Sequence, residues 1–198
     1  MTVAVLGWGS LIWCPGILRI TTRWQSDGPS LPIEFARISE DGRLTLVIQP
    51  SAENQTVYWA VSEFGEVAKA RCNLQAREGT IPRHVHYLAT DGTCAKDVLE
   101  QVRESVQVWL RVHEDVGAVI WTGLPTNWPN KRGCDFTPED AVRYLEELES
   151  DRNRAVSTFV RAQEYVKNTP PQIKTKVRRA MQERDWQDNE VSRILFEE

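Results

Sequence analysis

The sequence contains few of the residues that build metal centres and covalent cross-links. Its 198 residues include four cysteines and three histidines. The cysteines, Cys14, Cys72, Cys94 and Cys134, are far apart and form no Cys-x-x-Cys pair, so neither a disulfide framework nor a cysteine-based zinc site is expected. The first residues also lack the pattern of a signal peptide. We therefore expect reduced thiols, a cytoplasmic location and no bound metal.

An excess of positive charge and a long apolar run are also absent. The formal net charge is -4 and the isoelectric point is near 5.5, which leaves no overall basic field to attract nucleic acid or an anionic membrane surface. No apolar run approaches the ~20 residues needed to cross a bilayer. We expect no nucleic-acid and no membrane partner. The length suits one domain, with or without an appendage.

Hydrophobic patterning predicts strands in the first two thirds of the chain. Runs typical of strands occupy residues 3–7, 33–39, 43–49, 57–61, 83–89 and 116–124. Apolar residues at helical spacing predict helices over 63–77 and 95–113. The dipeptide Asp41-Gly42 separates two of the strands and favours a two-residue hairpin turn with positive φ at both central residues.

From Thr137 onward the sequence predicts helices. Thr137 suits an N-cap and Pro138 the first helical position, and helical spacing continues with breaks to about residue 185. The early strands are joined mostly by hairpin-length connections, so we expect an α+β fold with a mixed, barrel-like sheet. The expected division is a domain over 1–136 and a C-terminal helical extension over 137–198 packed on it.

A glycine-containing loop, Gly7-Trp8-Gly9-Ser10-Leu11, directly follows the first predicted strand. Its two glycines allow the backbone to come close either to a ligand or to another part of the protein. The third glycine and the helix that a dinucleotide-binding turn requires are missing.

Glu78 lies where the helix predicted over 63–77 stops. Gly79 follows it and is suited to the left-handed cap that ends many helices. Glu78 alone is one of 28 acidic residues, most of which are expected to be solvated charges. Its combination with the glycine-containing loop distinguishes it.

The loop and the Glu78-Gly79 pair resemble two motifs of the gamma-glutamylcyclotransferase-like superfamily. Members open from a first strand into a Tyr-Gly-Ser-Asn/Leu loop and carry a Glu-Gly at a helix end. Here Trp8 occupies the tyrosine position, and the continuation from Leu11 to Pro15 is similar to the ChaC-like branch. The resemblance covers approximately residues 3–124.

This resemblance implies an enzyme that releases 5-oxoproline from a gamma-glutamyl amide by intramolecular cyclisation. Glu78 would be the catalytic acid/base. The substrate would be a small gamma-glutamyl compound, with no cofactor and no metal. The residues implied to bind the substrate are Gly7, Trp8, Gly9, Ser10 and Leu11, where the backbone amides of the last three would hold a carboxylate or the developing oxyanion.

The alternative is a non-catalytic protein on the same fold, which binds a small acidic ligand in its pocket or a partner through its helical tail. A buried Glu78 with a raised pKa would favour the enzyme, because a general base works best near its operating pH. An ion pair of Glu78 with Arg77 or Arg83, or a position in bulk solvent, would favour the binding protein.

Other residues give weaker signals. His84 and His86 would share one face of the strand over 83–89 and could ligate a metal, but the remaining histidine, His113, is on a predicted helix. Ser10 lacks the surroundings of a nucleophile elbow. Tryptophans near the expected loops suit an apolar pocket, although core packing is their commoner role: Trp8, Trp13, Trp121 and Trp128.

Overall fold

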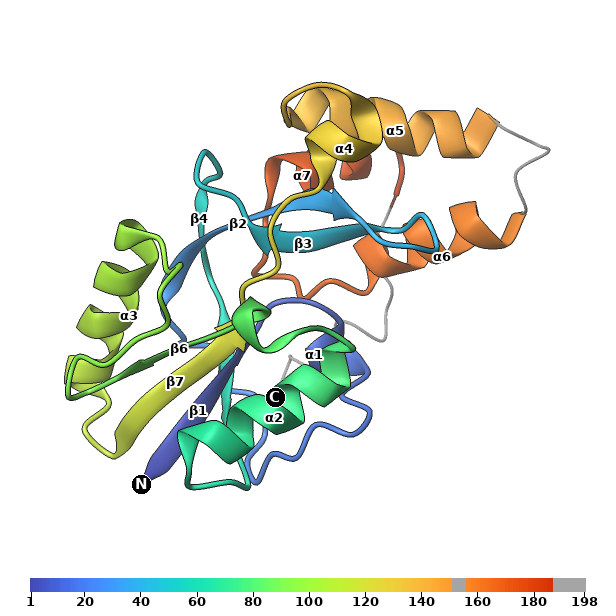
Figure 1. Cartoon of the computed structure of the whole chain (residues 1–198). Coiled ribbons are helices and arrows are strands. Elements are labelled where there is room, and N and C mark those ends of the chain that lie inside the picture. The colour runs from blue at the N-terminus through green and yellow to red at the C-terminus, as the bar shows by residue number, and fades with distance from the viewer. Residues whose placement is uncertain (151–155, 187–198) are drawn as a thin grey trace. The chain divides into compact units, whose positions relative to one another are not determined.

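The computed structural model in Figure 1 describes residues 1–150 and 156–186. The chain forms two compact units. The first unit contains Met1–Pro32 and Asn54–Leu124, and the second contains Ile33–Glu53 and the chain from Pro125 onward. These units are not the contiguous segments 1–136 and 137–198 expected from the sequence, because the hairpin within 33–53 packs with the C-terminal helices.

The first unit is built on a mixed sheet of four strands in the order β5-β1-β7-β6 (Figure 1). β1 is parallel to β7, and the other neighbouring pairs are antiparallel. The central strands β1 and β7 are buried over most of their length, which explains their nearly continuous apolar sequences. The four strands are β1 (Thr2–Gly7), β5 (Tyr58–Val61), β6 (Val85–Ala89) and β7 (Val116–Thr122).

Helix α2 (Val67–Glu78) covers one face of this sheet. Leu74 of the helix is fully buried in one apolar cluster with Val5 of β1 and Ile120 of β7. Helix α3 (Glu100–Val112) also contacts β6 and β7. The shorter elements of the first unit are α1 (Ser10–Trp13), the 3-10 turn η1 (Pro82–His84) and β4 (Asn54–Thr56), which pairs with the first residues of β2.

The second unit combines an antiparallel hairpin with helices. The hairpin consists of β2 (Ser30–Ile38, of which the first three residues belong to the first unit) and β3 (Leu44–Ile48). Hydrogen bonds join it to the helices: the Tyr144 hydroxyl donates to the Gly42 carbonyl at 2.6 Å, and Lys176 N–H donates to the Glu34 carboxylate at 2.9 Å. The helices are α4 (Trp128–Arg132), α5 (Pro138–Ser150), α6 (Val156–Lys167) and α7 (Lys176–Gln182).

The α+β class and the mixed sheet are confirmed, but a closed barrel is not found. In the described residues the strands form two open sheets, one of four strands and one of three. The N-cap prediction is confirmed, since the Thr137 hydroxyl accepts the Asp140 N–H at 3.1 Å. Within the described ranges, no helix is both long and apolar enough to cross a membrane.

Several element boundaries differ from the sequence-based expectation. The hairpin loop is longer than two residues: Ser39 N–H bonds to the Arg43 carbonyl, and only Gly42 in this turn has a positive φ, of 83°. Helix α3 begins at Glu100 rather than at 95, and α7 is confined to 176–182. Helix α4 lies in the segment between residues 124 and 137, to which the sequence patterning assigned neither a strand nor a helix.

Candidate functional site

Glu78 is the last residue of α2, as the sequence predicted. Gly79 follows it with φ at 59°, in the left-handed region, and its N–H bonds back to the Ala76 carbonyl. The next residue, Thr80, donates its N–H to the Gln75 carbonyl. These two backbone hydrogen bonds fix the end of the helix and therefore the position from which the Glu78 side chain extends.

The Glu78 carboxylate is largely shielded from solvent, with a side-chain exposure of 16%. Burial raises its pKa above the ordinary value, because removing water disfavours the charged form. The neighbouring Arg77 guanidinium lies 3.0 Å from Oε1 and acts in the opposite direction, but its effect is the smaller one. Glu78 thus has the raised pKa expected of an enzyme and the ion pair expected of a binding protein.

Arg77 joins Glu78 to the glycine-containing loop. Its Nη2 donates to the Ser10 hydroxyl at 3.1 Å and to the Cys14 carbonyl at 2.8 Å, while its Nε donates to the Pro15 carbonyl at 3.2 Å. Its Nη1 holds Glu78. One planar guanidinium therefore connects both sequence motifs, and the structure brings them together.

The expected substrate-binding residues differ in their surroundings. Gly7 ends β1, and Gly9 is the N-cap of α1. The side chains of Trp8 and Leu11 are buried, whereas Ser10 is partly exposed and bonded to Arg77. The Ser10 side chain is tied to Glu78 through Arg77 by hydrogen bonds.

The close backbone approach at Gly7 is made to the protein itself. A Cβ atom added to Gly7 would lie 2.8 Å from the six-membered ring of Trp24. Trp24 packs against the apolar cluster that contains Leu74 of α2. Contacts this short are not tolerated, so Gly7 is required for the indole to cover the end of β1. Trp24 gave no signal in the sequence that would link it to this loop.

Substitution Gly7→Ala is expected to destabilise the protein by about 1–3 kcal/mol, the usual cost of overpacking. The added methyl group would push Trp24 away from the core. Shortening the indole in the double variant Gly7→Ala/Trp24→Leu should recover part of that loss, and Trp24→Leu alone gives the reference for a double-mutant cycle. Urea unfolding measures all three variants. Strictly additive losses would contradict direct contact between the two residues.

Arg77 is the residue of this site whose role the sequence did not show. Its position in the last helical turn suits a cation, because helix C-termini carry partial negative charge. The sequence suggested only an ion pair with Glu78. Its bonds to residues 10–15 depend on tertiary packing of α2 beside α1, which a one-dimensional pattern does not specify.

The three histidines occupy different environments. His84 lies in η1 rather than on the strand, and its Nδ1 is 2.9 Å from the Thr80 hydroxyl, so the expected shared face with His86 is wrong. His86 is buried edge-on against Trp121, and burial lowers its pKa. His113 stacks on Trp109. Within the described part of the chain, no three potential ligands from His, Cys, Asp and Glu gather at one place.

The tryptophans expected near a pocket serve chiefly as core residues. Trp121 of the first unit and Trp128 of the second are fully buried. Trp8 is buried as well, and Trp13 is partly exposed.

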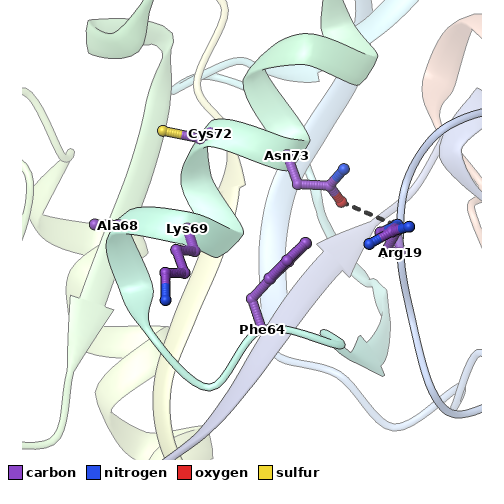
Figure 2. Close-up of a pocket in the computed structure, with 6 residues that line it drawn as sticks. All are labelled: Arg19, Phe64, Ala68, Lys69, Cys72 and Asn73. Atoms are coloured by element: carbon purple, nitrogen blue, oxygen red, sulfur yellow. Dashed lines mark hydrogen bonds between the residues drawn. The ribbon is translucent and has the colours of Figure 1, made fainter.

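An open hollow of about 510 Å³ is lined in part by side chains of α2, but not by Glu78 (Figure 2). Its two cations already have carboxylate partners: Arg19 pairs with Glu63 at 3.4 Å and Lys69 with Glu66 at 2.6 Å. The hollow therefore offers little net charge to a ligand, and we place the candidate site at Glu78. The residues lining the hollow are Arg19, Phe64, Ala68, Lys69, Cys72 and Asn73.

Comparisons of the chain with protein-family models, with curated proteins and with solved structures found no match.

Proposed function

We propose that the protein is a gamma-glutamylcyclotransferase-like enzyme with the corresponding fold, in which Glu78 is the general acid/base. The observation that supports this most strongly is the shielded Glu78 carboxylate, whose pKa is raised although Arg77 lies 3.0 Å away. A carboxylate of raised pKa accepts protons more readily near neutral pH than an ordinary surface glutamate.

The proposed reaction begins with the substrate's α-ammonium group, which must lose a proton before it can attack. Glu78 accepts this proton, and the free amine attacks the γ-carbonyl carbon to close a five-membered ring. Glu78 then returns a proton to the leaving amine. General acid/base catalysis contributes about 10²–10⁴-fold to such a rate. Because the nucleophile and the carbonyl belong to one molecule, the site has only to hold the reactive conformer.

The loop over Gly7–Leu11 would hold the substrate beside Glu78. Because the side chains of Trp8 and Leu11 are buried, the part of the loop offered to a ligand is its backbone and Ser10. Arg77 would fix the loop, since its bonds to Ser10, Cys14 and Pro15 set the distance between the loop and α2. The substrate class is a small gamma-glutamyl compound, and the reaction needs no cofactor.

A second candidate function is non-catalytic binding of a small acidic ligand on the same fold. The Arg77–Glu78 ion pair favours it, because the carboxylate can have the purely structural role of holding the guanidinium that anchors the loop. In that case Glu78 is a structural residue, and its charge is not used in chemistry.

A screen of gamma-glutamyl compounds for 5-oxoproline release tests the proposal. Glutathione, gamma-glutamyl amino acids and gamma-glutamylamines are incubated with wild type and with Glu78→Gln in parallel. We expect release with at least one compound and its loss in Glu78→Gln. Binding of a compound to both proteins without release by either would instead establish the second candidate function.

A further inference from the structure

Thr122 carries a buried hydroxyl group that the protein does not use. It is the last residue of β7, and its Oγ1 is inaccessible to solvent and makes no hydrogen bond in the structure. A buried hydroxyl without a partner costs free energy, because its bonds to water are lost and not replaced. A group of this kind requires an explanation, and one explanation is a functional role in binding or catalysis.

The strand register places Thr122 on the sheet face that α2 covers. Thr122 is paired with Val85 across the β6–β7 ladder and follows Ile120 by two residues. Val85 and Ile120 belong to the apolar cluster that contains Leu74 of α2. Since side chains two apart on a strand share a face, the Thr122 hydroxyl also lies on this face.

Helix α2 runs in the same direction as β1 and β7. The chain terminus at Met1 donates its amino group to the Gly65 carbonyl, just before the helix, whereas Arg77 at the helix end bonds to Ser10, after β1. β7 is parallel to β1. The C-terminal end of β7 and the C-terminal end of α2 therefore lie at the same end of the first unit.

Glu78 and Thr122 each end an element that leaves the same apolar cluster. Glu78 is one turn beyond Leu74, a rise of ~6 Å along the helix. Thr122 is two residues beyond Ile120, which is ~6.6 Å along the strand. Because Leu74 and Ile120 belong to one apolar cluster, these nearly equal steps lead from it toward the same end of the first unit, where α2 ends at Glu78 and β7 ends at Thr122.

We infer that the Thr122 hydroxyl is a further catalytic group of this site, which donates a hydrogen bond to the γ-carbonyl oxygen of the substrate. The inference rests on the proposed function. There, Glu78 takes the α-ammonium proton and the loop amides hold the carboxylate or the developing oxyanion, and the Thr122 hydroxyl would add a side-chain donor to the carbonyl oxygen.

The step that this hydrogen bond assists is balanced within the substrate. The amine nitrogen forms a bond to the γ-carbonyl carbon while the carbonyl π electrons move onto oxygen, which becomes an oxyanion. When the carbonyl re-forms, the bond to the leaving nitrogen breaks and that nitrogen takes the proton from Glu78. The ring nitrogen gives its second proton to the released amine, which departs as an ammonium ion. A hydroxyl that holds no other bond can donate to the oxyanion without breaking a contact in the protein.

The substitution Thr122→Val tests this role, because it removes the hydroxyl and preserves the shape of the side chain. We expect kcat for 5-oxoproline release to fall by about 10²–10³-fold with little change in KM, as for loss of one oxyanion donor. Thr122→Ser, which keeps a hydroxyl, should remain within about tenfold of wild type. Thr122→Val should also raise the Tm of the ligand-free protein by roughly 2–4 °C, because an unpaired buried hydroxyl is removed.

Thr90→Val is the matched control, since the Thr90 hydroxyl already donates to the Gly117 carbonyl at 3.2 Å and Thr90 is exposed. It should leave kcat unchanged and should not raise the Tm. An active wild type with an equally active Thr122→Val, or with a Thr122→Ser as slow as Thr122→Val, overturns the role of Thr122 alone. A wild type that releases no 5-oxoproline from any compound overturns the proposed function, and this role with it.

Discussion

Replacing Glu78 by glutamine is expected to lower kcat for 5-oxoproline release by about 10²–10⁴-fold, the contribution of a positioned general acid/base. Glutamine has nearly the same shape but accepts no proton at neutral pH, so the α-ammonium group of the substrate stays protonated. The fall should appear in kcat more than in KM, because the lost interaction belongs to the transition state. Steady-state kinetics on the best compound of the screen measures it.

The same substitution has a second expected effect, on stability. Burial raises the folded-state pKa of Glu78 above its usual value near 4.5. At pH values between the ordinary and the raised pKa, Glu78 has lost its proton in the unfolded chain but keeps it in the folded protein. The stability of the wild type therefore falls as pH rises through this range. Glu78→Gln cannot titrate there. It should therefore be more stable relative to wild type at pH 7 than at acid pH, which urea unfolding at both values compares.

Glu66→Gln is the control for this pair of effects. Glu66 precedes the same helix and pairs with Lys69, but its side chain is 66% exposed. The identical chemical change there should leave kcat unchanged and should alter the free energy of unfolding little, because this side chain lies largely in solvent. If Glu78→Gln retained full activity, Glu78 would be excluded as the acid/base.

The local features of the site could be predicted from the sequence. The end of α2 at Glu78 and the left-handed Gly79 follow from the loss of helical spacing and from the preference of glycine for positive φ. The strand leading into the Gly7–Leu11 loop follows from its apolar run. Each of these features depends on a few adjacent residues, so a local pattern is sufficient to specify it.

The features that the sequence did not specify depend on distant contacts. The four bonds of Arg77 join residues more than sixty positions apart, except for the one to its neighbour Glu78. The packing of Trp24 on Gly7 and the placement of Thr122 on the sheet face that α2 covers likewise depend on how strands and helix come together. The division into units was missed for the same reason, because the 33–53 hairpin binds helices about a hundred residues later.

Arg77→Met is expected to destabilise the protein by about 3 kcal/mol, the lower end of the cost of breaking a buried ion pair from one side. Both partners of this pair have a side-chain exposure of 16%, so the charge left on Glu78 would be poorly solvated. The Cys14 carbonyl would also lose the Arg77 donor, while the Pro15 carbonyl would keep the Leu18 N–H. Thermal and urea unfolding measure the loss, which should be larger at pH 7 than in acid, where Glu78 is protonated.

The pH profile of activity separates the electrostatic effect of Arg77 from a purely structural one. Arg77 opposes the rise in the Glu78 pKa, so its removal should raise that pKa further. The acid limb of kcat/KM, which reports the deprotonated base of the free enzyme, should therefore move to higher pH in Arg77→Met. Arg77→Lys keeps the charge without the planar fork and should move the limb less while still loosening the loop. If Arg77→Met lowered kcat/KM at every pH without moving the acid limb, Arg77 would act only by holding the loop.

The double variant Arg77→Met/Glu78→Gln identifies the source of the instability of Arg77→Met. If most of the instability of Arg77→Met comes from the uncompensated Glu78 charge, then neutralising Glu78 in that background should recover a large part of it. If it comes from the loop carbonyls, the double variant should be as unstable as Arg77→Met. The coupling energy from this cycle measures how strongly the guanidinium and the carboxylate depend on one another. A large coupling would show that one residue both anchors the loop and sets the protonation of the proposed base.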